Sequence, residues 1–281
     1  MADVAARIHT SGRVGTPPRL GARGRLLFKQ AAAVGVLFGA WELMTGGFGG
    51  LIQPAINPAL VPPPSAAVAD LVVYARSGLL ATDLATTLGA ALIGLLLGML
   101  GGLLVGLLLG SWRAGAEIVT PIFVGLNSLP RVALAPLFIV WFGLGMTSKI
   151  VLSLLVVFFV VFFNTYVGMR SIDPELTRAV RVMGATRMHT LRIVVVPAVL
   201  QWVFAALRTC VSFALTGAVV GEFVGSTGGL GYRMAVASGV LNSPRLFGIL
   251  LLLGLIGTLL VEMSKRLEQH LLRWQPAAPV N

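Results

Sequence analysis

Charged residues lie inside stretches that are otherwise apolar enough to cross a bilayer, among them Arg131, Arg208 and Glu222. A charge is costly to bury in lipid, so such residues are candidates for a transport pathway, a gate or an internal ion pair. Arg131 follows Pro130 at an expected helix break, where it either attracts an anionic substrate or reaches an aqueous vestibule. Arg208 and Glu222 are separated by about 21 Å along one helix, so they cannot pair within that helix.

Glu222 precedes a glycine-rich segment, and three roles stay open for its carboxylate. It lines a pathway, gates it, or holds the segment Gly221 to Tyr232, whose sequence is GEFVGSTGGLGY. Other polar residues within apolar stretches are further pathway candidates, although hydroxyls there more often bond across helices. They are Asn127, Ser128, Ser212 and Thr216.

The sequence contains no residue pattern that is typical of a catalytic or metal site. The histidines His9, His189 and His270 are far apart in the sequence, and no cluster with acidic residues or cysteine has metal-ligand spacing. No serine has a credible base beside it, and Cys210 lies in an apolar segment as a small buried hydrophobe. No G-x-x-x-x-G-K-[ST] phosphate loop occurs. We therefore expect no catalytic residue, no metal and no cofactor in this chain.

A basic, polar segment runs from Asp173 to Pro197 between two apolar stretches, and it must lie in water. Asp173 is a suitable N-cap, Pro174 suits a first helical turn, and Glu175 complements the positive end of the helix. These residues predict a helix that starts at Pro174. Gly184 predicts its end, with Ala185 to His189 beginning another turn. Five arginines accompany this segment: Arg170, Arg178, Arg181, Arg187 and Arg192.

Helical spacing gives the segment two faces. Arg178 and Arg181 project from one face, and an apolar face is formed by Leu176, Ala179, Val180 and Met183. Such a knob outside the membrane provides a surface that a partner can push, and it would pass the movement into the neighbouring apolar stretches.

The overall composition is that of an integral membrane protein. Hydrophobic residues make up 57% of the chain and charged residues 11%, with 34 glycines, and the mean hydropathy is +0.92. The net charge of +11 does not indicate a nucleic-acid partner, because no docking element of a soluble module accompanies it. Lys and Arg instead gather in cytoplasmic loops of membrane proteins.

A bilayer needs about 20 helical residues to cross, and this length predicts six spans in an all-α polytopic protein. The third is expected to be broken, because Pro121, Pro130 and Pro136 interrupt it. The first is expected to be a signal anchor rather than a cleaved signal peptide. An even number of spans puts both termini on one side, and the excess of Lys and Arg on that side makes it cytoplasmic. The spans are Leu26 to Thr45, Leu84 to Trp112, Ile118 to Ser148, Ile150 to Met169, Leu200 to Phe223 and Leu246 to Val261.

Two further patterns predict structure around the second span. Glycines recur every four residues along it and allow another helix, in this chain or in a second subunit, to approach closely. In the outer loop before it, Ser65 is expected to cap a short helix that begins at Ala66, the alternative being a flexible loop. The glycines are Gly94, Gly98, Gly102, Gly106 and Gly110.

The basic segment resembles the cytoplasmic loop of permease subunits in bacterial ATP-binding cassette importers. Those loops carry Glu-Ala-Ala, three residues, Gly, and later an apolar-Leu-Pro pattern. The matching positions here are Arg178, Ala179, Val180 and Gly184, followed by Val196 and Pro197, so the first glutamate is absent. The segments SLPRVALAPLFIVWFGLG and GEFVGSTGGLGY are similar to the sulfonate, taurine and nitrate branch of this group.

This resemblance implies a type I importer permease (MetI-like) fold in a bacterial inner membrane. It also implies partners: separate ATP-binding cassette ATPase subunits, an extracytoplasmic solute-binding protein, a second permease copy in a homodimer, and the lipid bilayer. ATP hydrolysis falls to the ATPase subunits. The residues implied in ATPase coupling are Arg178, Ala179, Arg181, Gly184, Ala185 and Pro197.

The rival hypothesis is a self-contained channel or ion-coupled transporter that uses Glu222. For either, the chain divides into a basic cytoplasmic tail (1–25), a first span with its external loop (26–83), a core (84–267) containing the coupling segment (173–197), and a C-terminal tail (268–281).

Overall fold

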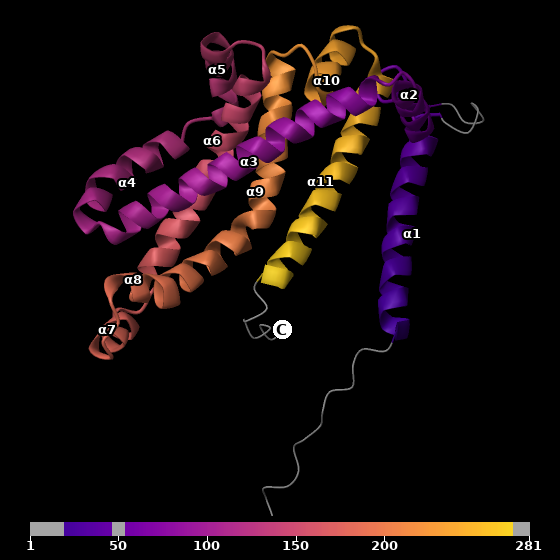
Figure 1. Cartoon of the computed structure of the whole chain (residues 1–281). Helices are drawn as coiled ribbons and strands as arrows, with labels where there is room; N and C mark the ends of the chain where they lie inside the picture. Colours follow the sequence, from indigo (N-terminus) through magenta and orange to yellow (C-terminus); the bar gives the residue numbers. More distant parts are fainter. Residues whose placement is uncertain (1–19, 47–53, 272–281) are drawn as a thin grey trace, which may run out of the picture.

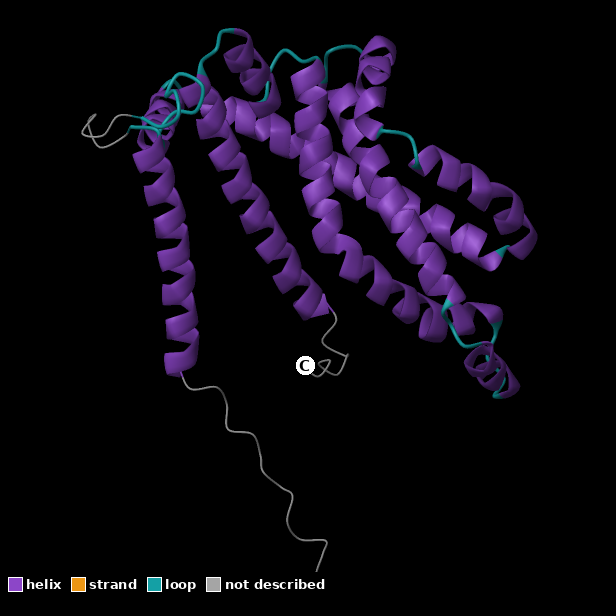
Figure 2. Cartoon of the chain, turned by 180° about the vertical axis from the view of Figure 1, so that it is seen from behind, coloured by secondary structure: helices purple, strands orange, loops and turns teal. Residues whose placement is uncertain are grey.

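The computed structural model describes residues 20–46 and 54–271, and these residues form helices joined by short loops (Figures 1 and 2). Residues 1–19, 47–53 and 272–281 lie outside the described residues. Five helices are long and apolar enough to cross a membrane. They are α1 (Leu20–Met44), α3 (Leu79–Ser111), α6 (Met146–Arg170), α9 (Val196–Val224) and α11 (Ser243–Leu271).

A bent pair of helices lies where the prolines predicted a broken span, and it makes a sixth crossing when the pair is counted as one span. Helix α4 (Arg113–Asn127) and the segment formed by the 3-10 turn η2 (Arg131–Leu134) and α5 (Ala135–Phe142) meet at 86°. The break falls at Pro130, which directly precedes η2, whereas Pro121 lies inside α4. The described part of the chain thus has the five to six apolar helices of the predicted all-α fold, and its bent pair lies where the broken third span was predicted.

The chain direction alternates from one crossing to the next. Figure 1 shows the start of α1, the end of α11 and the short helices α7 (Pro174–Val182) and α8 (Arg187–Thr190) at one end of the bundle. The opposite end carries α5, α2 (Pro64–Arg76) and α10 (Leu230–Gly239). The segment with the arginines therefore lies on the same side as both ends of the described chain.

The short helix α2 that was predicted before the second span exists, but its predicted start is wrong. It begins at Pro64 with Pro63 before it, and no side chain caps it. Proline is favoured at a first helical position because its missing N–H would have no partner there. Ser65 instead binds α1, since its hydroxyl donates to Oε1 of Glu42 at 2.5 Å and its N–H donates to Oε2 at 3.1 Å.

The five glycines of α3 all face α6 within the same chain. Because α3 and α6 run in the same direction, each four-residue step on one helix meets a four-residue step on the other. Gly94 meets Ser153, Gly98 meets Val157, Gly102 meets Val161, Gly106 meets Thr165 and Gly110 meets Met169. A Cβ on Gly98 would lie 2.8 Å from the Cβ of Val157, so the contact depends on the absence of side chains.

Helix α9 completes the core by packing on α6 and α3. Val157 and Val161 of α6 lie in one buried cluster with Ala214 and Cys210 of α9. Cys210 is fully buried, which confirms its predicted place as a small apolar side chain. The core therefore consists of the two helices that flank the arginine-bearing segment together with the glycine-rich α3.

Helix α1 stands apart from the others along most of its length (Figures 1 and 2). Its contacts lie near its C-terminal end, where Trp41 meets Phe247 of α11 with ring centroids 5.7 Å apart and Glu42 binds Ser65. The first span is thus attached at the end of the bundle that carries α2 and α10 rather than to the core.

Candidate functional site

The helix α7 starts where its sequence predicts. The Asp173 carboxylate accepts a hydrogen bond of 2.8 Å from the N–H of Glu175, and Pro174 is the first helical residue. An N-cap side chain of this kind satisfies one of the backbone donors that a helix start leaves without a partner. The start of the segment is therefore fixed by local chemistry alone.

Its end is also local. Gly184 has φ +91°, its N–H donates to the carbonyl of Arg181 at 2.9 Å, and the N–H of Ala185 donates to that of Val180 at 3.2 Å. This pair of bonds is the Schellman motif, in which a residue of positive φ ends a helix. The next turn starts at Arg187, after Thr186 accepts the N–H of His189 at 3.2 Å.

The segment returns to the membrane through a widened helical turn. The five residues of η3 (Leu191–Val195) form a π-helix, and the N–H of Val196 donates to the carbonyl of Leu191. Pro197 follows at the start of α9 and has no N–H to continue an ordinary α-helical ladder. The predicted coupling residue Pro197 therefore lies at the joint between the protruding segment and α9.

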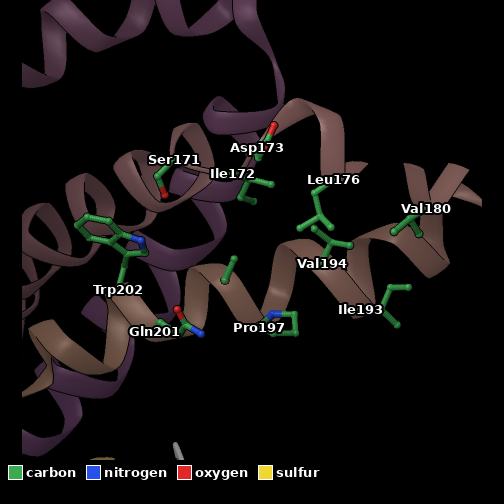
Figure 3. Close-up of a pocket in the computed structure, with 11 residues that line it drawn as sticks. Ser171, Ile172, Asp173, Leu176, Val180, Ile193, Val194, Pro197, Gln201 and Trp202 are labelled. Atoms are coloured by element: carbon green, nitrogen blue, oxygen red, sulfur yellow. The ribbon is translucent and has the colours of Figure 1, made fainter. Parts of the chain in front are cut away.

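A groove separates α7 from the start of α9. Its volume is about 570 Å³, and Figure 3 shows Leu176 of α7 facing Val194 across it. Val180 and Ile193 lie toward one end, and Trp202 closes the other. The side chains that face each other across this groove are mainly apolar, and the knob is connected to α9 along the chain through α8 and η3.

The tip of the knob is strongly exposed. Val182 and Met183 are 88% and 86% exposed, and Arg178, Ala179 and Arg181 are exposed as well. The predicted apolar face is therefore divided, because Leu176 and Val180 turn to the groove while Ala179 and Met183 face outward. An exposed surface of arginine and apolar side chains has the composition of a protein-docking site.

At the opposite end, Glu222 is fully buried and binds three other elements. Its Oε2 accepts from the hydroxyl of Thr87 at 2.8 Å and from the N–H of Gly231 at 2.9 Å, and its Oε1 lies 3.6 Å from Nζ of Lys149. Of the three roles left open for Glu222, these contacts are those of a residue that holds the glycine-rich loop.

A second carboxylate, Asp83, lies beside the same loop. It accepts from the N–H of Gly229 at 2.7 Å, from the Tyr74 hydroxyl at 2.6 Å and from Nε of Arg233 at 2.6 Å. Burial, together with the bond to Asp83, raises the pKa of Tyr74 well above its usual range, so it stays a donor. The bond to Asp83 likewise raises the pKa of Arg233.

Sequence reasoning missed Asp83, Thr87 and Lys149 as members of this cluster. Asp83 and Lys149 directly precede two of the predicted spans. Charged residues are common at the ends of membrane spans, so their position alone did not mark them as members of a cluster. Thr87 gave no signal, since it is one of several hydroxyls at the start of α3.

The other predicted pathway residues do not join Glu222. Arg131 donates to Asn127 and lies 5.9 Å from the ring centre of Phe159, while Ser128 donates to the carbonyl of Val124 at 2.9 Å. On α9, Ser212 donates to the carbonyl of Arg208 at 3.3 Å and Thr216 to that of Ser212 at 2.9 Å. Ser128 and Arg131 lie at the break after α4, whereas Ser212 and Thr216 lie one turn apart on α9. The three hydroxyls each bond to a backbone carbonyl four residues earlier in the chain.

Arg208 pairs with another helix rather than with Glu222. Its Nε lies 3.1 Å from Oε2 of Glu268 in α11. The expectation that Arg208 and Glu222 do not pair is thus confirmed.

Fold and site together define a multi-span helical membrane protein with an exposed helical knob between two core helices. The chain belongs to the family described as binding-protein-dependent transport system inner membrane component, whose sequence profile matches residues 94–273. It is therefore a multi-pass inner-membrane protein of a transport family rather than an enzyme family.

Among its relatives, the riboflavin transport system permease protein RibX of Chloroflexus aurantiacus is 40% identical over 57% of this chain and 59% of that protein. The formylaminopyrimidine transport permease protein ThiX of Halalkalibacterium halodurans is 34% identical over 58% of this chain and 66% of that protein. A putative aliphatic sulfonates transport permease protein SsuC of Bacillus subtilis is 33% identical over 53% and 54%. The chain thus spans about three fifths of the length of these relatives.

Solved structures show the same fold. A chain of the inward-facing MetNI methionine ABC transporter aligns with a TM-score of 0.62 at 24% identity, over 69% of this chain and 97% of that chain. A chain of an amino acid ABC transporter aligns with a TM-score of 0.56 at 19% identity, over 73% and 98%. The predicted MetI-like fold is confirmed.

Proposed function

We propose that this chain is the permease subunit of an ATP-driven importer and that the segment from Asp173 to Pro197 couples it to separate ATPase subunits. The observation that carries this proposal is the exposed knob of α7 and α8, which is joined directly to both core helices α6 and α9. A force applied to the knob reaches the core without an intervening flexible linker. The knob and both described chain ends then face the cytoplasm.

The remaining parts of the transporter follow from the family. A solute-binding protein delivers substrate to the end that carries α2, α5 and α10, and a second permease copy completes the pathway. Arg131, Ser128, Ser212 and Thr216 are the residues of this chain proposed to line it, with Arg131 favouring an anionic solute. Glu222 is assigned to the support of the glycine-rich loop before α10 instead.

For the substrate, we propose a small anion such as a sulfonate, taurine or nitrate. Support comes from Arg131 and from the relatives named for aliphatic sulfonates. Relatives named for riboflavin and formylaminopyrimidine favour a second candidate, a planar heterocyclic nutrient. Mass spectrometry of the ligand that copurifies with the cognate binding protein distinguishes the two. A heterocycle in that protein would overturn the anion proposal.

The coupling proposal is tested by reversing charge on the knob. We expect Arg178→Glu with Arg181→Glu to insert normally, to lose copurification with the ATPase subunits and to abolish stimulation of ATP hydrolysis. A matched control is Lys265→Glu with Arg266→Glu, because these exposed residues lie near the same end of the protein but on α11. Normal ATPase association in the knob variant would contradict the assignment.

A second test separates the importer from an ion-coupled transporter. The chain alone, reconstituted in vesicles under a proton or sodium gradient, is expected to show no solute uptake. Addition of the ATPase subunits, ATP and the binding protein is expected to start uptake. Uptake by the chain alone would support the self-contained transporter.

A further inference from the structure

The helix α10 begins without a cap of its own. The residue before it is Gly229, which has no side chain and a φ of +109°. Backbone N–H groups at a helix start need acceptors, and inside a membrane protein water does not supply them readily. The acceptors must therefore come from elsewhere in the chain.

Three successive N–H groups donate to side-chain oxygens that belong to two other helices. The N–H of Gly229 donates to Asp83 at 2.7 Å, that of Leu230 to the Thr87 hydroxyl oxygen at 2.9 Å, and that of Gly231 to Glu222 at 2.9 Å. Asp83 and Thr87 are on α3, one helical turn apart, and Glu222 is on α9. The start of α10 is thus bonded to both.

The loop before α10 is held as well. Nζ of Lys149, at the start of α6, donates to the carbonyl of Gly228 at 2.8 Å, and the Ser226 hydroxyl donates to the same carbonyl at 2.7 Å. Lys149, Asp83, Thr87 and Glu222 are each at most 4% exposed. Breaking these bonds would leave buried charges without partners, which is strongly unfavourable.

The backbone at the start of α10 packs directly against the Glu222 side chain. A Cβ on Gly229 would overlap the Glu222 carboxylate, and a Cβ on Gly231 would lie 2.8 Å from the Cβ of Glu222. The helices that hold the loop are themselves joined by the glycine contacts of α3 with α6 and by the buried cluster of α6 with α9.

We infer that Asp83, Thr87, Lys149 and Glu222 are positioning residues that fix α10 and the glycine-rich loop before it to α3, α6 and α9. The end of the bundle that carries α10 then moves as one body with the knob. Resting on the proposed function, this makes the loop from Gly225 to Leu230 a fixed cap and not a lid that opens in each transport cycle. Movement imposed on the knob then reaches the outer surface that receives the solute.

The first test is hydrogen exchange of the whole reconstituted complex, without nucleotide and with a non-hydrolysable ATP analogue. The amides of Gly229, Leu230 and Gly231 are expected to exchange equally slowly in both states. Faster exchange of these amides in either state would show that the loop opens and would overturn the inference.

The second test removes one acceptor. Thr87→Val keeps the side-chain shape and is expected to speed exchange at the start of α10 roughly tenfold, because Leu230 loses its buried partner. Solute moved per ATP hydrolysed is expected to fall severalfold. Thr86→Val is the matched control, since that neighbouring hydroxyl is exposed and bonds only to the carbonyl of Thr82 at 2.8 Å.

Thr87→Ser retains the hydroxyl acceptor, so slow exchange and normal transport per ATP are both expected to return. If Thr87→Val fails to assemble, Thr87→Ser still tests whether a hydroxyl at this position is sufficient. Unchanged exchange and unchanged transport per ATP in Thr87→Val would overturn the inference. Failure of the native complex to transport with ATP would instead refute the proposed function, and the exchange measured without nucleotide would still report on the anchoring.

Discussion

Gly102 of α3 lies against Val161 of α6 so closely that a Cβ at Gly102 would stand 2.9 Å from the Cβ of Val161. The same built atom would lie 2.7 Å from the carbonyl oxygen of Phe158, which belongs to the backbone and cannot turn aside. The contact between these helices is therefore limited by backbone approach, and small residues are required there.

Gly102→Ala is expected to destabilise the protein by about 1–3 kcal/mol, the usual cost of overpacking a close contact. The measurement is the thermal unfolding midpoint in detergent. Gly101→Ala is the control, because its Cβ would lie 3.4 Å from the Phe158 ring, an ordinary contact distance. Equal midpoints for the two variants would contradict the close approach of α3 and α6.

Gly184→Ala is expected to impair coupling through backbone strain alone. No atom lies within 4 Å of a Cβ at Gly184, but its φ of +91° costs a residue with a side chain about 1–2 kcal/mol. We expect weaker ATPase association in a copurification assay. Gly184→Asn should lose less, because asparagine tolerates this conformation better. If alanine and asparagine bind equally well, strain at Gly184 does not control docking.

Asp173→Ala is expected to loosen the start of α7 by about 1 kcal/mol, since its carboxylate accepts the N–H of Glu175. Asp173→Ser should retain most of the stability because serine also caps helices. Proteolysis of the knob in the assembled membrane protein measures the difference. Equal cleavage rates for alanine and serine would show that the cap does not hold the segment.

The pair Arg208 and Glu268 is expected to contribute little, about 0.2–1 kcal/mol, because Arg208 is 47% exposed and solvent screens its charge. A double-mutant cycle with Arg208→Gln and Glu268→Gln measures this coupling as a shift in unfolding free energy. High salt should reduce it further. A coupling of several kcal/mol would mean that the pair is enclosed by another subunit.

The segment from Asp173 to Pro197 could be predicted in detail because its structure is local. The cap at Asp173, the proline after it and the positive φ of Gly184 act within one or two helical turns, and they produced the helix bounds observed. The broken third crossing was equally local, since proline alone accounts for the break at Pro130. Ser65 is the exception, because its best partner, Glu42, lies on another helix.

Hydropathy and backbone chemistry depend on neighbouring residues, so the membrane class, the apolar crossings and the shape of the knob could be read from the sequence. Two arrangements became visible only in the folded chain: the glycines of α3 meet α6, and Asp83, Thr87 and Lys149 join Glu222 around the start of α10. They could not be predicted because an apolar span carries almost no pattern that fixes its rotation or its neighbours. Which side chains meet is set by the packing of whole helices against one another.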